Sequence, residues 1–200
     1  MNYVAIDTSG KHLTLIVKKG ESIYEYFDSD CGVHHSVRVM EELEKLLVKA
    51  DFKPADADFY AVCVGAGSFT GIRIGLSTAK AMAFATNKPL LGITSFDTAA
   101  YNTDRKKVLS IIDAGHNGYY VCAYVDKKAE KAEFVKGEDL ARFTGYRFVS
   151  GEKINGVNTA VVSVKDGLIK AVEDKSGLAS NDINAVSPLY LRKSQAEEGR

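Results

Sequence analysis

The hydrophobic pattern of the first 27 residues predicts three short strands in an antiparallel meander. Apolar runs occupy residues 3–6, 12–17 and 22–27, and clusters of turn-forming residues at 7–10 and 18–21 separate them. Short apolar runs joined by tight turns are typical of neighbouring antiparallel strands. The chain is therefore expected to open with a three-stranded sheet.

Between residues 33 and 50 the spacing of apolar positions changes to that of a helix with two apolar stripes. A helix that only covers its own sheet needs one stripe. The second stripe is expected either to meet a partner or to be buried by deep packing, and the pattern leaves both open. The stripes are Val33, Val37, Met40, Leu43 and Leu47, and then Val39, Leu46 and Ala50.

The next segments predict an alternation of strands and helices. Residues 59–64 form an apolar strand, and a glycine-rich loop then leads into a helix rich in small residues that ends near residue 87. Pro89 precedes a further strand at 90–93, and Ser95 is suited to cap a short helix through Tyr101. The predicted order to about residue 103 is βββαβαβα.

The second half gives weaker signals. The polar segment 102–107 is the best linker candidate, so domains are predicted at residues 1–103 and 104–200. Strands are expected at 108–113, 119–126 and 189–191, and a helix at 164–173 capped by Ser163, whereas 127–159 shows no clear pattern. Residues 193–200 have the composition of a polar tail.

Charge balance, the lengths of the apolar runs and the cysteine spacing exclude several classes of protein. Lys plus Arg and Asp plus Glu both number 26, so the formal net charge is zero, whereas a protein that grips RNA alone usually carries a basic excess. The N-terminal residues lack a signal-peptide pattern, and no apolar run approaches the roughly 20 residues that span a bilayer. The three cysteines form no CxxC pair, which disfavours a zinc knuckle or a disulfide framework. A cytoplasmic protein without a membrane segment is expected.

Residues 65–75, with the sequence GAGSFTGIRIG, form the most informative stretch. A glycine-rich turn that leads from a strand into a helix can bind an anion at the helix N-terminus. However, Ile72 follows Gly71 where the Walker pattern requires Lys, and Thr70 stands where the dinucleotide fingerprint requires a third glycine. A purely structural role for the loop therefore stays as open as anion binding.

The helix after this loop carries small residues at every fourth position. Gly71, Gly75, Ala79 and Ala83 share one face, which lets another helix approach closely. Each glycine in a helix costs about 1 kcal/mol relative to alanine, so close packing is expected to offset that cost. The packed helix is either that of residues 33–50, one from a second copy, or one from a different protein.

The same stretch resembles the signature GPGSFTGIRIG of the TsaB (YeaZ) family. Further resemblances, in the family's order, are residues 4–9, His35-Ser36, residues 92–95, Asp113-Ala114 followed by Tyr119-Tyr120, and residues 188–192. The chain departs from the family pattern at Ala66, at Val37 and at residues 116–118. The resemblance implies an actin-like (ASKHA, RNase H-like) two-lobed α/β fold, with a mixed sheet flanked by helices in each lobe.

The family resemblance also implies a function and partners. It implies a non-catalytic scaffolding subunit in the synthesis of N6-threonylcarbamoyladenosine in tRNA. The partners would be the transferase TsaD and the ATPase TsaE, with tRNA reached only through the complex, and a homodimer is expected when TsaD is absent. The interface would lie on the N-terminal helices, at His35, Val39, Leu43, Leu46, Gly71, Gly75, Ala79, Met82 and Ala83.

Two enzymatic alternatives remain. Asp7, Ser9, Gly67 and Ser68 form a candidate degenerate nucleotide turn, as in an actin-like ATP-binding phosphotransferase or ATPase, although Asp7 can equally cap its own turn. A metal-dependent peptidase would need converging ligands, and the adjacent His34 and His35 diverge by about 100° on a helix. No catalytic residue, no metal site and no cofactor other than this nucleotide are therefore assigned.

Overall fold

The structure, a computed structural model, describes residues 1–192 and divides into two compact units. Unit 1 contains Met1–Ile93 and Val172–Pro188, and unit 2 contains Thr94–Ala171 and residues 189–192. These units differ from the domains predicted at 1–103 and 104–200. The short helix that follows Ile93 belongs to unit 2, and a segment from the second half of the chain belongs to unit 1.

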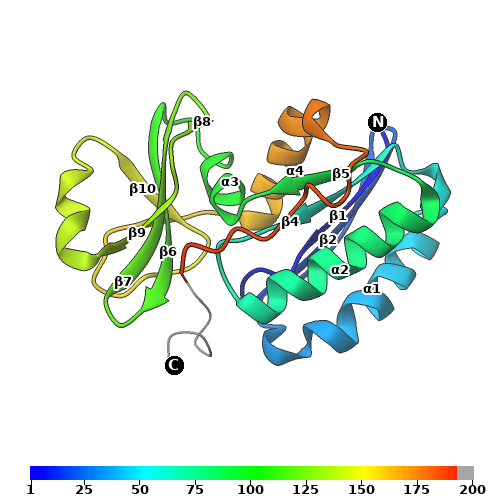
Figure 1. Cartoon of the computed structure of the whole chain (residues 1–200), viewed down its shortest axis with the longest axis horizontal. Coiled ribbons are helices and arrows are strands. Elements are labelled where there is room, and N and C mark those ends of the chain that lie inside the picture. Colours follow the sequence, from blue (N-terminus) through cyan, green and yellow to red (C-terminus); the bar gives the residue numbers. More distant parts are fainter. Residues whose placement is uncertain (193–200) are drawn as a thin grey trace. The chain divides into compact units, whose positions relative to one another are not determined.

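Unit 1 is built on a five-stranded mixed sheet in the order β3-β2-β1-β4-β5 (Figure 1). The first three strands pair antiparallel, as the apolar runs predict, and β4 and β5 continue the sheet parallel to β1. Every residue of β1 and β4 is buried, because both faces of these strands are covered. The strands are β1 (Tyr3–Asp7), β2 (Leu13–Lys19), β3 (Ser22–Asp28), β4 (Phe59–Cys63) and β5 (Leu90–Ile93).

Two long helices, α1 (His35–Lys49) and α2 (Phe69–Thr86), run side by side along this sheet (Figure 1). Short 3-10 turns, η1 (Gly32–His34) and η2 (Pro54–Asp56), lie before and after α1. The Ser68 side chain caps α2 by accepting a hydrogen bond from the Gly71 amide. The helix ends where Asn87 adopts the left-handed conformation, a common C-terminal signal.

The segment that returns to unit 1 is held by the sheet. Helix α4 (Val164–Lys175) ends in this segment, and η4 (Ser176–Leu178) follows it. Ser180 pairs with Leu90 through two backbone hydrogen bonds of 2.9 and 3.0 Å, and Glu173 forms an ion pair with Lys18. The edge strand β5 thereby gains a partner from a distant part of the sequence.

Unit 2 contains a second mixed sheet, in the order β11-β10-β6-β7-β8, with β9 paired to β7. Strand β6 pairs antiparallel with β7 and parallel with β10. The elements are α3 (Ser95–Ala100), β6 (Lys107–Gly115), β7 (Gly118–Val125), β8 (Lys128–Ala129), β9 (Glu133–Lys136), η3 (Gly137–Arg142), β10 (Arg147–Ser150) and β11 (Ala160–Val161). Four of these eight, β8 to β10 with η3, lie within residues 127–159, where the sequence gave no clear pattern.

Helix α3 belongs to unit 2 because its buried carboxylate is bonded there. Its cap is Thr94 and not Ser95: Thr94 accepts a hydrogen bond from the Asp97 amide and donates to the Asp97 carboxylate. Tyr124 of β7 donates a 2.8 Å hydrogen bond to the same carboxylate. On α4, a Cβ atom at Gly167 would lie 1.7 Å from the Thr98 carbonyl oxygen, so the backbones of α3 and α4 are in contact.

Two expectations concern the C-terminal segment. The structure has no strand at residues 189–191, so that prediction is wrong. A run of three apolar residues after Pro188 is too short to specify a strand without a partner edge. The predicted polar tail at 193–200 lies outside the described residues. None of the helices within residues 1–192 has the length and apolar character required to cross a membrane.

Candidate protein-interaction site

The turn after β1 and the loop after β4 lie together at one end of the unit 1 sheet. These parallel strands are neighbours, so their C-terminal ends share one edge. The Ser68 amide donates a 2.7 Å hydrogen bond to the Ser9 carbonyl oxygen. A Cβ atom at Gly67 would lie 2.2 Å from that oxygen, at a φ of +151° that favours glycine. The structure therefore brings Asp7, Ser9, Gly67 and Ser68 into one cluster.

The carboxylate of Asp7 is buried in this cluster and bonded to groups of its own unit. Its Oδ1 accepts hydrogen bonds from the Ser9 amide at 2.8 Å and from Ser9 Oγ at 2.7 Å. His12 Nε2 donates to Oδ2 at 3.1 Å. Burial alone would raise the pKa of Asp7, but the charge and hydrogen bond of His12, together with the bonds from Ser9, outweigh it and lower the pKa to about 2.

This geometry fits the interpretation that Asp7 caps its own turn. Both carboxylate oxygens of Asp7 already accept hydrogen bonds from groups of unit 1. The Ser9 hydroxyl that donates to Asp7 also lies 3.3 Å from Cys63 Sγ. A nucleotide at this turn stays a prediction. Within residues 1–192 no group of three or more His, Cys, Asp or Glu side chains is placed to hold a metal ion.

The lowered pKa of Asp7 predicts a loss of stability in acid. The carboxylate stabilises the fold above its ordinary pKa of 3.8, and this contribution disappears as the pH falls through about 2. The difference between the two pKa values corresponds to about 2 kcal/mol. Urea unfolding between pH 5 and pH 2 should show this loss in unit 1. The Asp7→Asn variant should lose less over the same range, and an equal loss in both proteins would contradict the assignment.

The small residues of α2 face the sheet of unit 1. A Cβ atom at Gly71 would lie 2.0 Å from the Thr8 carbonyl oxygen, and one at Gly75 would lie 2.5 Å from Thr8 Oγ1. Ala79 and Ala83 are also fully buried. The glycines therefore let α2 pack closely on β1 and the turn that follows it. This corrects the interpretation that the face is left bare for a second protein's helix.

Helix α1 buries one of its two apolar stripes and exposes most of the other. Val39, Leu46 and Ala50 are buried, whereas Val37 and Met40 are 69% and 54% exposed. His35 is buried as well, and its Nε2 donates a 2.8 Å hydrogen bond to the carbonyl oxygen of His12. All four predicted interface residues on α1 are buried, namely His35, Val39, Leu43 and Leu46.

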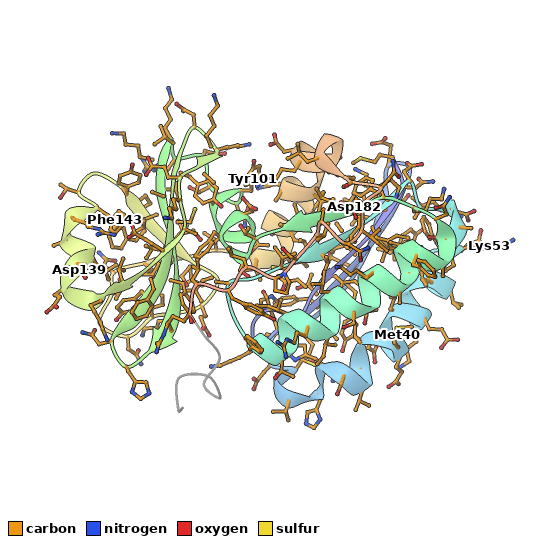
Figure 2. The ribbon with its side chains drawn as sticks, viewed as in Figure 1. Met40, Lys53, Tyr101, Asp139, Phe143 and Asp182 are labelled. Atoms are coloured by element: carbon orange, nitrogen blue, oxygen red, sulfur yellow. The ribbon has the colours of Figure 1, made fainter. Side chains whose placement is uncertain are left out.

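The exposed sides of α1 and α2 form an apolar groove of about 500 Å³. Figure 2 labels Met40, one of its residues on α1. Leu43 and Met82 are the predicted interface residues that line it. The complete lining is Met40, Glu41, Leu43, Glu44, Leu47, Pro54, Thr78, Ala81, Met82, Ala85 and Thr86.

Sequence reasoning placed the partner interface on α1 and α2, the two helices that line this groove, but most of the residues that it named are buried. It missed Thr78, Ala81 and Ala85 on α2, because a stripe of glycine and alanine at every fourth position gave the stronger signal. The two apolar stripes of α1 were visible in the sequence. Their spacing could not show which one faces the sheet.

Known proteins match the part of the chain that contains α1 and α2. Residues 29–165 match the family model described as TsaD, tRNA N6-adenosine threonylcarbamoyltransferase. The tRNA threonylcarbamoyladenosine biosynthesis protein TsaB of Bacillus subtilis is 33% identical over 102 residues, which cover 51% of this chain and 44% of that protein. TsaB of Escherichia coli is 28% identical over 128 residues, covering 62% and 55%. The chain belongs to the TsaB (YeaZ) family.

The fold is that of the TsaB family along nearly the whole chain. YeaZ from Pseudomonas aeruginosa superimposes with a TM-score of 0.80 at 18% identity, covering 95% of this chain and 99% of that one. The predicted two-part α/β fold class is thereby confirmed. In sequence, the chain spans about half the length of the curated TsaB proteins that it matches.

Proposed function

We propose that this chain is a non-catalytic scaffolding subunit in the synthesis of N6-threonylcarbamoyladenosine in tRNA. In this proposal it binds a TsaD-type transferase through the groove between α1 and α2. The observation that carries the proposal is the exposed apolar stripe of α1 beside Ala81 and Ala85 of α2. Family membership supplies the biological process, and the groove supplies a surface suited to a protein partner.

The chemistry of the groove suits a helix from the partner. Met40 and Leu47 contribute bulky, adaptable side chains from α1, whereas Ala81 and Ala85 leave space on α2. Amphipathic helices bind hydrophobic grooves through apolar residues at helical spacing, and methionine adapts well to irregular surfaces. The carboxylate of Glu44 on the rim would favour a basic residue beside the apolar face of that helix.

The remaining features of the proposal follow from the same surface. When the transferase is absent, two copies of the chain would pair through the groove, because an isologous contact buries the same apolar stripe twice. TsaE would join the complex, and tRNA would be held by the partners, since the chain has no net charge. The proposal places the complex in the cytoplasm.

A charge in the centre of the groove should abolish binding of the transferase. We expect Ala81→Arg to weaken binding at least thirtyfold, because a desolvated charge at an interface core costs 2 kcal/mol or more. Isothermal titration calorimetry of the purified chain with the TsaD-type transferase of the same organism measures this. The matched control is Ala129→Arg, at an exposed alanine of β8 in unit 2, which should bind like the natural protein.

Different outcomes of this experiment separate the alternatives. Ala81 is exposed, so thermal unfolding should show that the variant remains folded. Unchanged affinity of Ala81→Arg for the transferase would reject the groove as the interface. Transfer of threonylcarbamoyl to tRNA by the chain alone would reject the non-catalytic role.

A further inference from the structure

Unit 2 contains a hollow of about 350 Å³ that the proposed function does not use. This volume lies near the lower end of the range for small-molecule sites. The hollow is bounded by the β6–β7 turn, by η3, by β10 and by the loop before β11. Its lining residues are Asn117, Tyr119, Gly137, Leu140, Ala141, Phe148, Gly156, Val157 and Asn158.

The apolar part of the hollow is an edge of the core of unit 2. Tyr119 and Leu140 belong to the main hydrophobic cluster of this unit and are 6% and 8% exposed. Phe148 and Val157 pack against that cluster and remain partly accessible. Flat aromatic and branched aliphatic groups therefore border a space that is open on one side.

The polar part of the hollow is built around Asn117. This residue adopts a left-handed conformation with a φ of +56° at the tip of the β6–β7 turn. Its carbonyl oxygen accepts a 3.0 Å hydrogen bond from the Gly137 amide, which joins the turn to η3. A Cβ atom at Gly137 would lie 2.4 Å from Asn117 Oδ1, so the absence of a side chain at Gly137 leaves room for the carboxamide.

The side-chain carboxamides of Asn117 and Asn158 are available to hydrogen-bond a ligand in the hollow. Among residues 1–192, no side-chain hydrogen bond engages the amide group of Asn117 or that of Asn158. None of the described residues lining the hollow carries a charged side chain. A ligand suited to this site is therefore neutral, planar on one face and rich in adjacent donors and acceptors at its edge.

We propose that this hollow binds an adenine base, either as a free nucleoside or as an unpaired base of RNA. Asparagine can pair with adenine in two hydrogen bonds, accepting from N6 and donating to N7. Unpaired bases commonly lie against Tyr or Phe side chains in protein sites. Phe148, which is only partly buried, supplies such a surface beside the two carboxamides. The inference is separate from the proposed function, because it uses only residues of unit 2.

Titration of the full chain with adenosine, followed by amide NMR, tests the inference. We expect a dissociation constant below about 1 mM, with shifts concentrated at Asn117, Tyr119, Gly137 and Asn158. Uridine should bind at least about fivefold more weakly, since it lacks the N6 and N7 pair. A parallel titration with short oligoadenylate identifies the source: shifts at the same residues indicate an unpaired RNA base, and their absence indicates the free nucleoside.

Two variants complete the test. Asn158→Ala should weaken adenosine binding at least about fivefold, whereas Asn184→Ala, an exposed asparagine of unit 1, should leave it unchanged. Asn117→Gly keeps the left-handed turn and should weaken binding to a similar extent. Equal affinity for adenosine and uridine, no shifts around the hollow at millimolar adenosine, or undiminished binding by Asn158→Ala would each overturn the proposal.

Discussion

Replacing Gly71 by alanine should lower the free energy of unfolding of unit 1 by about 3 kcal/mol or more. The added Cβ atom would lie 2.0 Å from the carbonyl oxygen of Thr8, which is backbone and cannot rotate away. Thr8 Oγ1 also donates a buried 2.7 Å hydrogen bond to the Gly71 carbonyl oxygen, and any shift of α2 would strain that bond. The helix propensity gained from alanine, about 1 kcal/mol, is too small to compensate.

The matched control for this variant is Gly177→Ala. A Cβ atom at Gly177 would meet nothing within 4 Å, so the same chemical change should be nearly neutral. Hydrogen exchange of the β1 and β4 amides in increasing urea reports the stability of unit 1 specifically. Equal stability of Gly71→Ala and Gly177→Ala would show that α2 does not pack on the turn after β1 as described.

Replacing Asp7 by alanine should cost about 3 to 5 kcal/mol in unit 1. The change leaves the Ser9 amide and hydroxyl without their acceptor and removes the buried counter-ion of His12. Removing one member of a buried ion pair has a cost of this size, because the remaining polar groups stay desolvated. Urea unfolding followed by the same amide signals at pH 7 measures the loss.

A second aspartate shows whether this loss is specific. Asp104 lies exposed between α3 and β6 of unit 2, and Asp104→Ala should change the free energy of unfolding by less than about 0.5 kcal/mol. The Asp7→Ala protein should also show less acid destabilisation than the natural protein. A variant at Asp7 as stable as the one at Asp104 would rule out a structural role for the buried carboxylate.

Much of unit 1 could be predicted from the sequence because its signals are local. The apolar runs of β1 to β3 are separated by turn residues, and Ser68 and Asn87 mark the two ends of α2. The order of strands and helices to residue 100 is the predicted one. These features depend on neighbouring residues, so periodicity and capping rules are sufficient.

The candidate site could be predicted only in part, because burial depends on contacts distant in sequence. Gly71 and Gly75 require close packing, but only the fold shows that the packed element is the turn at Thr8 and not another helix. The strands of β8 to β11 contain two to four residues each, too few for a pattern to emerge. The hydrogen bond from Tyr124 to Asp97, which links α3 to unit 2, could not be predicted because the two residues are distant in the sequence.

The return of residues 172–188 to the first sheet affects how the protein can be divided. Expression of residues 1–103 alone would omit Ser180, which pairs with the edge strand at Leu90, and Glu173, the partner of Lys18. The polypeptide changes unit after Ile93, after Ala171 and again after Pro188. Neither half is therefore a contiguous gene fragment, and an autonomous version of the first would require a circular permutation or a synthetic linker that carries residues 172–188.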